Sequence, residues 1–498
     1  MNLHEWLPLL ILGSSLLTGI CIFFLAEEQR GLRTFLNLAG AFIKLALVVY
    51  MVVGMARGET YETRFPIVLG FDFVLKADSL SLLLVGLSSG LWLLTTVYAI
   101  GYLEHWKNRS RFFGFFSFCV TASVGVALAG NPITFFIFYE FLTLSTYPLV
   151  IHRGSVEALR AGRTYLWYTM AGGALVFTGV VWLHVLVGSV DFREAGVLAV
   201  VDPSLYPSLT LIFALLICGL GVKAALVPLH GWLPVAMVAP APVSALLHAV
   251  AVVKAGAFGI VRVVYDLFGV QFADQLGLLT PLTIAASITI LYGSLRALTQ
   301  DDLKKRLAYS TVSQVSYIAL GVSMIGATAT IGGLVHLVHQ GIMKITLFFC
   351  AGIFAETVHV KAISNMNGIG RRFPLTMGAF TIGALGMIGV PPVAGFISKW
   401  YLGLGAMASG QPWVLLVLLG STALNAGYFL PVLYRAWFRD PDGPWHEEGP
   451  VGRLEAPWML LVPCLITGLL SLLTGVFAGA DWSPLSLARI IAMKEYLP

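Results

Sequence analysis

The chain has 498 residues, of which 58% are hydrophobic and only 11% are charged, and its mean hydropathy is +0.86. Soluble domains carry about 25% charged residues, so this composition excludes an ordinary soluble protein and predicts an all-α polytopic membrane protein. The net charge of +5 comes from basic residues in short connections between apolar runs, which indicates membrane topology rather than nucleic-acid binding.

About fourteen apolar runs, each near the roughly 20 residues that cross a bilayer, follow one another along the chain. We expect helices over 6–26, 32–56, 79–103, 112–130, 131–151, 164–188, 208–230, 240–264, 278–299, 307–326, 328–355, 374–404, 412–438 and 457–479. Lys and Arg gather in every second connection, so the positive-inside rule predicts that both termini lie outside. The polar connection 440–455 is expected to be a cytoplasmic loop.

Prolines predict two broken helices. Pro228 and Pro234 follow Lys223 closely, and Pro391-Pro392 interrupt the run 374–404 before Lys399. Proline removes a helical hydrogen bond, which is tolerated at membrane depth only where the freed carbonyls meet protein or water. Two broken helices, each with a buried lysine, indicate paired half-repeats around an ion path.

Ionisable residues inside the apolar runs are the candidate functional residues, because such residues are costly in a membrane and usually mark ion pathways. The strongest candidates for proton translocation are Glu140, Lys223, Lys254 and Lys399. Glu140 and Lys223 are expected to form a coupled pair whose approach and separation change the affinity of the lysine for a proton. For each of these residues a purely structural ion pair is the alternative.

A polar stripe is predicted on the helix 328–355, where His336, Gln340 and Lys344 recur at four-residue spacing. On the helix 240–264, His248 is followed by Lys254 about a third of a turn round. We expect these groups, with His339, to form a relay that runs sideways through the membrane. Hydrogen bonding between helices is the alternative for the histidines.

Other charged residues are expected to lie at the membrane surface. Lys44 is expected to snorkel to the headgroups, and Arg262 and Asp266 are assigned to the interface because they fall near the end of a run. Five isolated cysteines and the absence of a nucleotide-binding glycine motif predict no cofactor and no metal site. Bond-making catalysis is not expected.

Three stretches carry a resemblance to a known family: the segment around Glu140, the pattern Lys223-x4-Pro228-x-His230-x-Trp232-x-Pro234, and the segment 302–314. They resemble the antiporter-like subunits shared by respiratory complex I, Mrp-type cation/proton antiporters and membrane-bound hydrogenases. The resemblance implies fourteen transmembrane helices and two inverted five-helix repeats whose members include broken helices 7 and 12.

The resemblance also implies roles and boundaries. Glu140 and Lys223 form the coupled pair, Lys254 the central relay, His336 and Lys344 the bridge, and Lys399 the exit-side lysine. The expected regions are 1–110 for the first three helices, 111–265 and 277–438 for the two repeats, and 439–498 for the last loop, helix and tail. The second histidine of the bridge is displaced, because Gln340 takes its expected place and a histidine stands at 339.

A lysine at 399 is similar to the Mrp D subunit and its hydrogenase relatives. The sequence therefore favours a proton-translocating subunit of an Mrp-type sodium/proton antiporter in a bacterial or archaeal inner membrane, assembled with other hydrophobic membrane subunits. The alternatives are a proton-pumping subunit of a redox-driven complex, a membrane subunit of an inorganic-carbon uptake complex, and a scaffold that conducts no ion.

Overall fold

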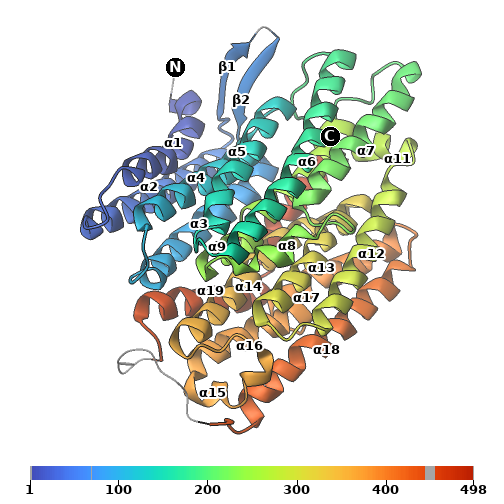
Figure 1. Ribbon diagram of the computed structural model, residues 1–498. Coiled ribbons are helices and arrows are strands. Elements are labelled where there is room, and N and C mark those ends of the chain that lie inside the picture. Colours follow the sequence, from blue (N-terminus) through green and yellow to red (C-terminus); the bar gives the residue numbers. More distant parts are fainter. Residues whose placement is uncertain (1–2, 69, 444–454, 497–498) are drawn as a thin grey trace.

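A computed structural model describes residues 3–68, 70–443 and 455–496, and it confirms an all-α polytopic membrane protein (Figure 1). Within these residues, twelve helical spans are long and apolar enough to cross a bilayer by themselves. The long helices before the first break are α1 (Leu3–Phe23), α2 (Arg30–Ala56), α3 (Ser79–Tyr102), α4 (Arg109–Leu128), α5 (Pro132–Val150), α6 (Val156–Val187) and α7 (Tyr206–Lys223).

The remaining helices complete the bundle. They are α8 (Trp232–Val235), α9 (Ala241–Ala249), α10 (Val252–Arg262), α12 (Leu279–Leu298), α13 (Leu303–Ser323), α14 (Ala327–Thr357), α16 (Pro374–Ile388), α17 (Ala394–Ala408), α18 (Val414–Phe438) and α19 (Trp458–Val476). The most apolar stretches of α14 and of the span that contains α9 and α10 are buried completely. The centre of the molecule is therefore built on these two spans.

Both predicted breaks are confirmed. Helix α7 ends at Lys223, and the chain passes through Ala225 in the left-handed region, with φ of +58°, before α8 begins. Helix α16 ends at Ile388, and Gly389 has φ of +96° before α17 begins. Glycine adopts this conformation without steric cost, whereas alanine does not. The first break therefore places a strained residue two positions after Lys223.

The helix predicted over 240–264 is not continuous, which corrects the sequence analysis. Helix α9 ends at Ala249 and α10 begins at Val252, and Ala251 has φ of −99° and ψ of −91°. No proline marks this interruption, so the local sequence carried no signal for it. The rotation expected between His248 and Lys254 on one helix therefore does not apply.

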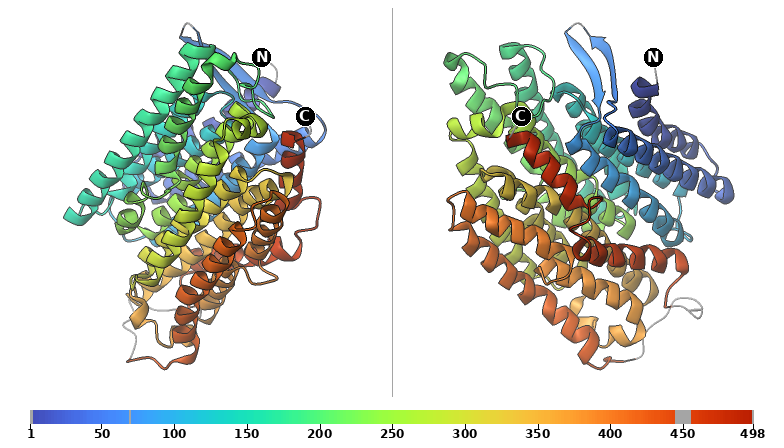
Figure 2. Two further views of the ribbon diagram at one scale, coloured as in Figure 1. Left: turned by 90° about the vertical axis from the view of Figure 1, so that its right-hand side faces the viewer. Right: turned by 180° about the vertical axis from the view of Figure 1, so that it is seen from behind.

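Two further elements were not predicted. Strands β1 (Glu62–Val68) and β2 (Phe71–Lys76) pair antiparallel, with Glu62 opposite Lys76, in a hairpin that projects from the helices (Figure 1). Helix α20 (Pro484–Tyr496) packs against α14 and α3 and is visible in the rear view of Figure 2. The Tyr496 hydroxyl accepts a hydrogen bond of 2.9 Å from the Gly326 amide, just before α14.

Short helices occupy the connections: η1 (Pro203–Leu205), η2 (Ala236–Val238), η3 (Val263–Phe268), α11 (Val270–Gln275), η4 (Ile363–Asn365) and α15 (Ile369–Arg372). Much of the loop predicted over 440–455 lies outside the described residues. At its start, an exposed ion pair of 2.7 Å joins Asp440 to Arg371. The chain termini point toward the same end of the molecule as the hairpin, and α15 lies at the other end (Figure 1).

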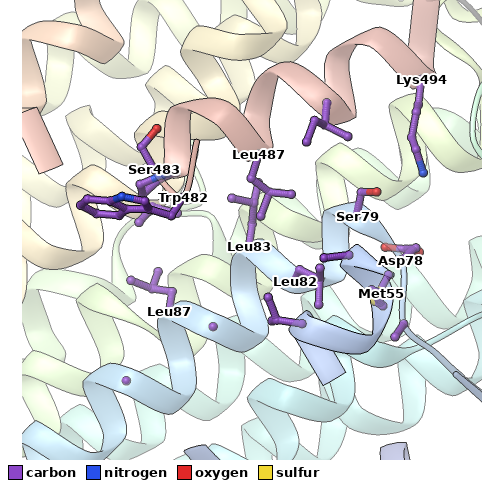
Figure 3. A pocket seen from close by; sticks show the side chains of 18 of the residues that line it. Met55, Asp78, Ser79, Leu82, Leu83, Leu87, Trp482, Ser483, Leu487 and Lys494 are labelled. Carbon is purple, nitrogen blue, oxygen red and sulfur yellow. The ribbon is translucent and has the colours of Figure 1, made fainter. Parts of the chain in front are cut away.

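A groove of about 1250 Å³ lies between α3 and α20 (Figure 3). Leu83 and Leu87 of α3 face Leu487 of α20, and Asp78, Ser79 and Lys494 stand at one end. Val338 and Ile342 of α14 also line it. Since α14 carries the predicted polar stripe, the groove approaches the centre of the bundle from the side.

Candidate functional site

The predicted relay residues lie in the interior of the protein. Six of the eight are 0% exposed, and Glu140 and Lys399 are partly buried. The fully buried side chains are Lys223, His248, Lys254, His336, His339 and Lys344. Ionisable groups this deep in a membrane protein are expensive to retain and are therefore functional candidates.

Glu140 and Lys223 lie close together without forming a direct ion pair. The Lys223 ammonium donates a hydrogen bond to the carbonyl oxygen of Tyr139 and lies 3.3 Å from the centroid of the Tyr139 ring. One carboxylate oxygen of Glu140 is buried and has no hydrogen-bond partner among the described residues. The carboxylate lies against α6, where a Cβ on Gly173 would come within 2.2 Å of that oxygen. The two side chains are therefore neighbours, but each contacts other groups instead of its partner.

Lys254 is the most isolated charge in the site. Its ammonium has no hydrogen-bond partner in the part of the chain that the structure describes. Its charge acts on both His336 and Lys344 of α14. Two residues later, Gly256 packs so closely on the end of α7 that a Cβ would lie 2.2 Å from the Ala224 nitrogen. The contact joins α10 to the end of α7, and Lys254 lies about 200° round α10 from Gly256, on the opposite face of the helix.

The polar stripe on α14 carries the next two residues of the site, His336 and Lys344. His336 Nδ1 lies 2.8 Å from the Ser398 hydroxyl of α17, while its Nε2 lacks a hydrogen-bond partner within the described ranges. Lys344 donates to the Leu307 carbonyl at 3.0 Å and to the Ser310 hydroxyl. His339 lies off this stripe but acts electrostatically on His336.

His248 joins the stripe from α9. Its ring stacks on Phe348 at 4.5 Å, and neither ring nitrogen has a hydrogen-bond partner among the residues described. The charge of Lys344 acts on it. His248 therefore forms no hydrogen bond between helices in the described residues, contrary to the alternative considered for the histidines.

Lys399 of α17 reaches back to the second break. Its ammonium donates to the carbonyls of Met387 and Ile388, at 3.0 and 2.8 Å, and lies 5.5 Å from the Tyr317 ring. Its charge acts on His336. The lysine therefore satisfies carbonyls that the end of α16 leaves free.

Unpartnered polar atoms follow the same line. In the described part of the chain, both side-chain atoms of Gln314 and of Gln340 lack hydrogen-bond partners, as does the Tyr317 hydroxyl. Buried polar atoms are nearly always satisfied by protein or by water, and buried waters typically serve such groups. The arrangement suits a hydrated line of side chains along which protons move.

Several residues of the site were not predicted. Tyr139 and Tyr317 each place a ring beside a lysine, and Ser398 reaches His336. Gln314 lies in the segment 302–314, which carries part of the family resemblance, so that segment was the signal that could have identified it. Tyr139 stands on the apolar helix α5 and Tyr317 on α13, and neither position differs in sequence from that of an aromatic packing residue.

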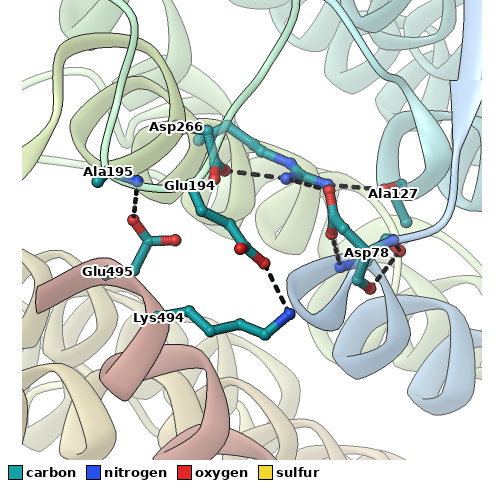
Figure 4. Close-up of polar contacts among 9 residues, drawn as sticks. Asp78, Ala127, Glu194, Ala195, Asp266, Lys494 and Glu495 are labelled. Carbon is teal, nitrogen blue, oxygen red and sulfur yellow. Dashed lines mark hydrogen bonds and ion pairs between the residues drawn. The ribbon is translucent and has the colours of Figure 1, made fainter. Parts of the chain in front are cut away.

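Three surface assignments were wrong. Lys44 is 0% exposed and does not snorkel. Arg262 and Asp266 are 1% and 2% exposed, because Arg262 pairs with Asp78 at 2.7 Å and with Asp266 at 2.9 Å (Figure 4). Position near the end of an apolar run indicated exposure, but the carboxylates neutralise the arginine within the protein.

Helix α20 closes this ion-pair cluster. The Glu495 carboxylate accepts a hydrogen bond of 2.9 Å from the Ala195 amide, and Lys494 pairs with Glu194 at 2.9 Å (Figure 4). Burial, together with the nearby Asp266 carboxylate, raises the pKa of Glu495 to about 8. The folded chain therefore keeps this proton at pH values where the unfolded chain has lost it, so the free energy of unfolding falls as the pH rises from 4.5, the ordinary pKa, to about 8.

The sequence and the fold match known proteins. Residues 129–425 match the family model described as NADH:quinone oxidoreductase/Mrp antiporter, TM, and residues 67–113 match that described as NADH-Ubiquinone oxidoreductase (complex I), chain 5 N-terminus. The chain is 35% identical to NADH-quinone oxidoreductase subunit N of Desulforudis audaxviator, with 95% of this chain and 96% of the relative covered.

Two other similarities extend over nearly the whole chain. It is 27% identical to the D subunit of the Na(+)/H(+) antiporter of Bacillus subtilis, with 97% of this chain and 95% of the relative covered. The fold matches a chain in the solved structure of the Mrp complex from Dietzia sp. with a TM-score of 0.87 and 22% identity, covering 100% of this chain and 98% of the other. The protein therefore belongs to the NADH:quinone oxidoreductase/Mrp antiporter transmembrane family, as an antiporter-like membrane subunit.

Proposed function

We propose that this chain translocates protons across the membrane as one subunit of a multi-subunit complex. The observation that carries the proposal is the buried series of ionisable side chains from Lys223 through Lys254 and α14 to Lys399. Within the series, Lys254 lies near enough to His336 and Lys344 to act on them electrostatically, and Lys399 acts on His336. Lys254 nevertheless has no hydrogen-bond partner among the described residues. A structural salt bridge would pair these charges, whereas a relay keeps sites open for an arriving proton.

The coupled pair supplies the switch. Lys223 already rests on the Tyr139 ring and carbonyl, so its side chain can hold a positive charge without touching Glu140. Approach of the Glu140 carboxylate favours the charged ammonium, and its withdrawal favours release of the proton. The released proton passes toward Lys254, whose helix packs on the end of α7 through Gly256.

The second half completes the path. His336 of α14 contacts Ser398 at 2.8 Å, and Ser398 directly precedes Lys399 on α17. Lys344 and His248 extend the same polar region. Proton movement through the site is therefore sequential, because neighbouring positive charges repel one another.

We propose exchange of protons for a monovalent cation such as Na⁺, in an Mrp-type antiporter, as the process that this chain serves. The similarity to the D subunit of a Na(+)/H(+) antiporter over nearly all of both chains supports this reading. A redox-driven proton pump is the second candidate, and the higher identity to NADH-quinone oxidoreductase subunit N favours it. Both candidates use the same relay. The partner subunits decide whether cation exchange or a redox reaction drives the protons.

Proton flux into vesicles tests the relay. Purified complexes that carry Lys223→Ala or Glu140→Gln should lose flux about 100-fold, because each substitution removes one member of the switch. Lys107→Met, at an exposed position between α3 and α4, is the matched lysine control and should retain normal flux. Full flux from either relay variant in an assembled complex would reject its role.

Purification of the native complex separates the two candidates. Iron–sulfur clusters in co-purifying subunits would favour the redox-driven pump. Sodium-dependent proton flux with only hydrophobic partner subunits would favour exchange. The identification of subunits by mass spectrometry reports on the partners independently of any flux.

We also propose the membrane orientation and the internal division. The basic connections face the cytoplasm of a bacterial or archaeal cell and both termini face outward. Residues 111–265 and 277–438 form two repeats of five helices, and a broken helix stands fourth in each. The support is the shared placement of a lysine beside a tyrosine ring, Lys223 on Tyr139 and Lys399 on Tyr317.

A further inference from the structure

Lys44 is a buried lysine outside the relay. Helix α2 lies at the edge of the bundle and turns residues such as Phe35 and Phe42 outward, with 66% and 58% exposure, but Lys44 points inward and is 0% exposed. Its ammonium donates to the Ser15 hydroxyl at 2.5 Å and lies 5.0 Å from the Trp92 ring. No carboxylate lies within ion-pair distance of it in the described ranges. A lysine without a counter-ion at this depth indicates a function.

A polar face on α2 leads from Lys44 toward one end of the helix. Arg33, Asn37 and Lys44 all belong to the buried side of α2, and about 10 Å separates Asn37 from Lys44 along the axis. The Asn37 amide donates to the Arg33 carbonyl at 3.0 Å, while its own oxygen lacks a partner among the described residues. Arg33 donates to the Ser110 hydroxyl at 2.8 Å. This end belongs to a basic connection, so it is assigned to the cytoplasm.

Hydroxyl groups lead from Lys44 into the bundle. The Ser15 hydroxyl, which accepts from Lys44, lies 2.7 Å from the Thr121 hydroxyl of α4. Two residues further along α4, the Ser123 hydroxyl lies 3.3 Å from that of Ser88 on α3. Thr121 and Ser123 lie about 200° apart round α4, so Thr121 faces α1 and Ser123 faces α3. The two hydroxyl pairs are therefore separate and lie on opposite sides of α4.

This polar region reaches the interruption between α9 and α10. Ser123 donates a hydrogen bond of 3.2 Å to the carbonyl oxygen of Val250, the last residue but one before α10 begins. His248 and Lys254 stand on the two sides of that interruption. The carbonyl that the interruption frees is thus bound by a side chain from α4 rather than by a residue of the relay.

Unpartnered polar atoms lie along the same route. Within the described residues, Ser89 Oγ, Trp92 Nε1 and Ser117 Oγ have no hydrogen-bond partner, although Ser89, Trp92 and Ser117 are all 0% exposed. Buried polar atoms of this kind are the usual sites of ordered water. Water between them would join the separate hydrogen-bonded pairs into one path.

We propose that Lys44 is a proton-carrying side chain on a second branch, which runs from the cytoplasmic end of α2 through α3 and α4 to the relay at the interruption beside Val250. The inference rests on the proposed function. The neutral Lys44 amine accepts a proton from hydronium, and the resulting ammonium returns it to water on the side of α3 and α4. No bond other than those to hydrogen changes.

Substitutions at Lys44 distinguish proton transfer from packing. Arginine keeps the positive charge but does not release its proton in proteins, whereas histidine titrates near neutral pH. We expect Lys44→Met and Lys44→Arg to lower proton flux per assembled complex on the order of tenfold, and Lys44→His to retain more flux than Lys44→Arg. A structural charge would give the opposite order, with arginine the better substitute.

Variants along the branch test the route with the lysine in place. Ser15→Ala and Ser123→Ala remove one hydroxyl each and should lower flux severalfold. Val48→Ala, on the same buried face of α2, is the packing control and should retain the wild-type flux. Complex recovered after purification serves as the measure of assembly for every variant.

Besides higher flux in Lys44→Arg than in Lys44→His, two results would overturn the branch. One is wild-type flux in Lys44→Met, or in Lys44→Arg alone. The other, which decides the matter if the Lys44 variants do not assemble, is wild-type flux in both serine variants. Lys223→Ala is measured in parallel: loss of flux there with normal flux in the branch variants rejects the branch only, whereas normal flux in Lys223→Ala rejects the proposed function.

Discussion

The two broken helices hold their lysines differently. Lys223 and Lys399 each lie beside a tyrosine ring, Tyr139 on α5 and Tyr317 on α13. In the first half a carboxylate, Glu140, follows the tyrosine, whereas Ile318 takes that place in the second half. The switch that we propose for the first lysine therefore has no counterpart at the matching position beside the second.

The freed carbonyls also differ. At the first break the Trp232 indole donates to the Val222 carbonyl at 2.7 Å, so Lys223 is not needed to satisfy the end of α7. At the second break, Lys399 itself donates to Met387 and Ile388, and Asn425 adds a bond of 3.1 Å to Met387. Lys399 thus helps to satisfy the end of its own broken helix, whereas Lys223 donates to the Tyr139 carbonyl of a neighbouring helix.

Neutral substitution of the two lysines gives the largest expected contrast. Lys223→Met should remove proton flux about 100-fold while the thermal unfolding midpoint of the purified complex stays close to wild type. Lys399→Met should lower both flux and the midpoint, because the Ile388 carbonyl loses its lysine donor while the Met387 carbonyl keeps only Asn425. An equal loss of thermal stability in the two variants would show that both lysines stabilise their breaks to the same extent.

Glycine contacts at the two breaks give the next largest effect. A Cβ on Gly256 would lie 2.2 Å from the Ala224 nitrogen, and one on Gly395 would lie 1.9 Å from the Gly386 oxygen. Alanine at either position should destabilise the fold by about 1–3 kcal/mol through overpacking, measured as a lower thermal midpoint. Gly86→Ala on α3 is the control, because nothing lies within 4 Å of its Cβ position. A normal midpoint for Gly256→Ala would mean that α10 can move away from α7.

The tyrosine hydroxyls give the smallest effect. The Tyr139 hydroxyl donates to the Gly219 carbonyl at 3.0 Å, whereas the Tyr317 hydroxyl has no partner among the described residues. Tyr139→Phe should therefore lower the stability of the complex by about 1 kcal/mol, and Tyr317→Phe should leave it unchanged. Both retain the ring beside the lysine. A larger loss in Tyr317→Phe would reveal a hydrogen bond formed in another state of the relay.

Membrane physics made much of this protein readable from its sequence. A long apolar run must form a helix because lipid offers no partner to the backbone, so most of the helices were predicted to within a few residues. Prolines marked two breaks, because each proline removes a helical hydrogen bond that lipid cannot replace. The roles of Glu140, Lys223, Lys254 and Lys399 stay predictions until flux is measured.

What the sequence could not supply depends on contacts between helices. The interruption at Val250 and Ala251 carries no proline, and its carbonyl is satisfied by Ser123 from another helix. The burial of Lys44 and Arg262 depends on Ser15 and on Asp78, which lie 29 and 184 residues away in the chain. Apolar character fixes where a helix crosses the membrane, but only packing decides which of its faces meets lipid and which meets the interior.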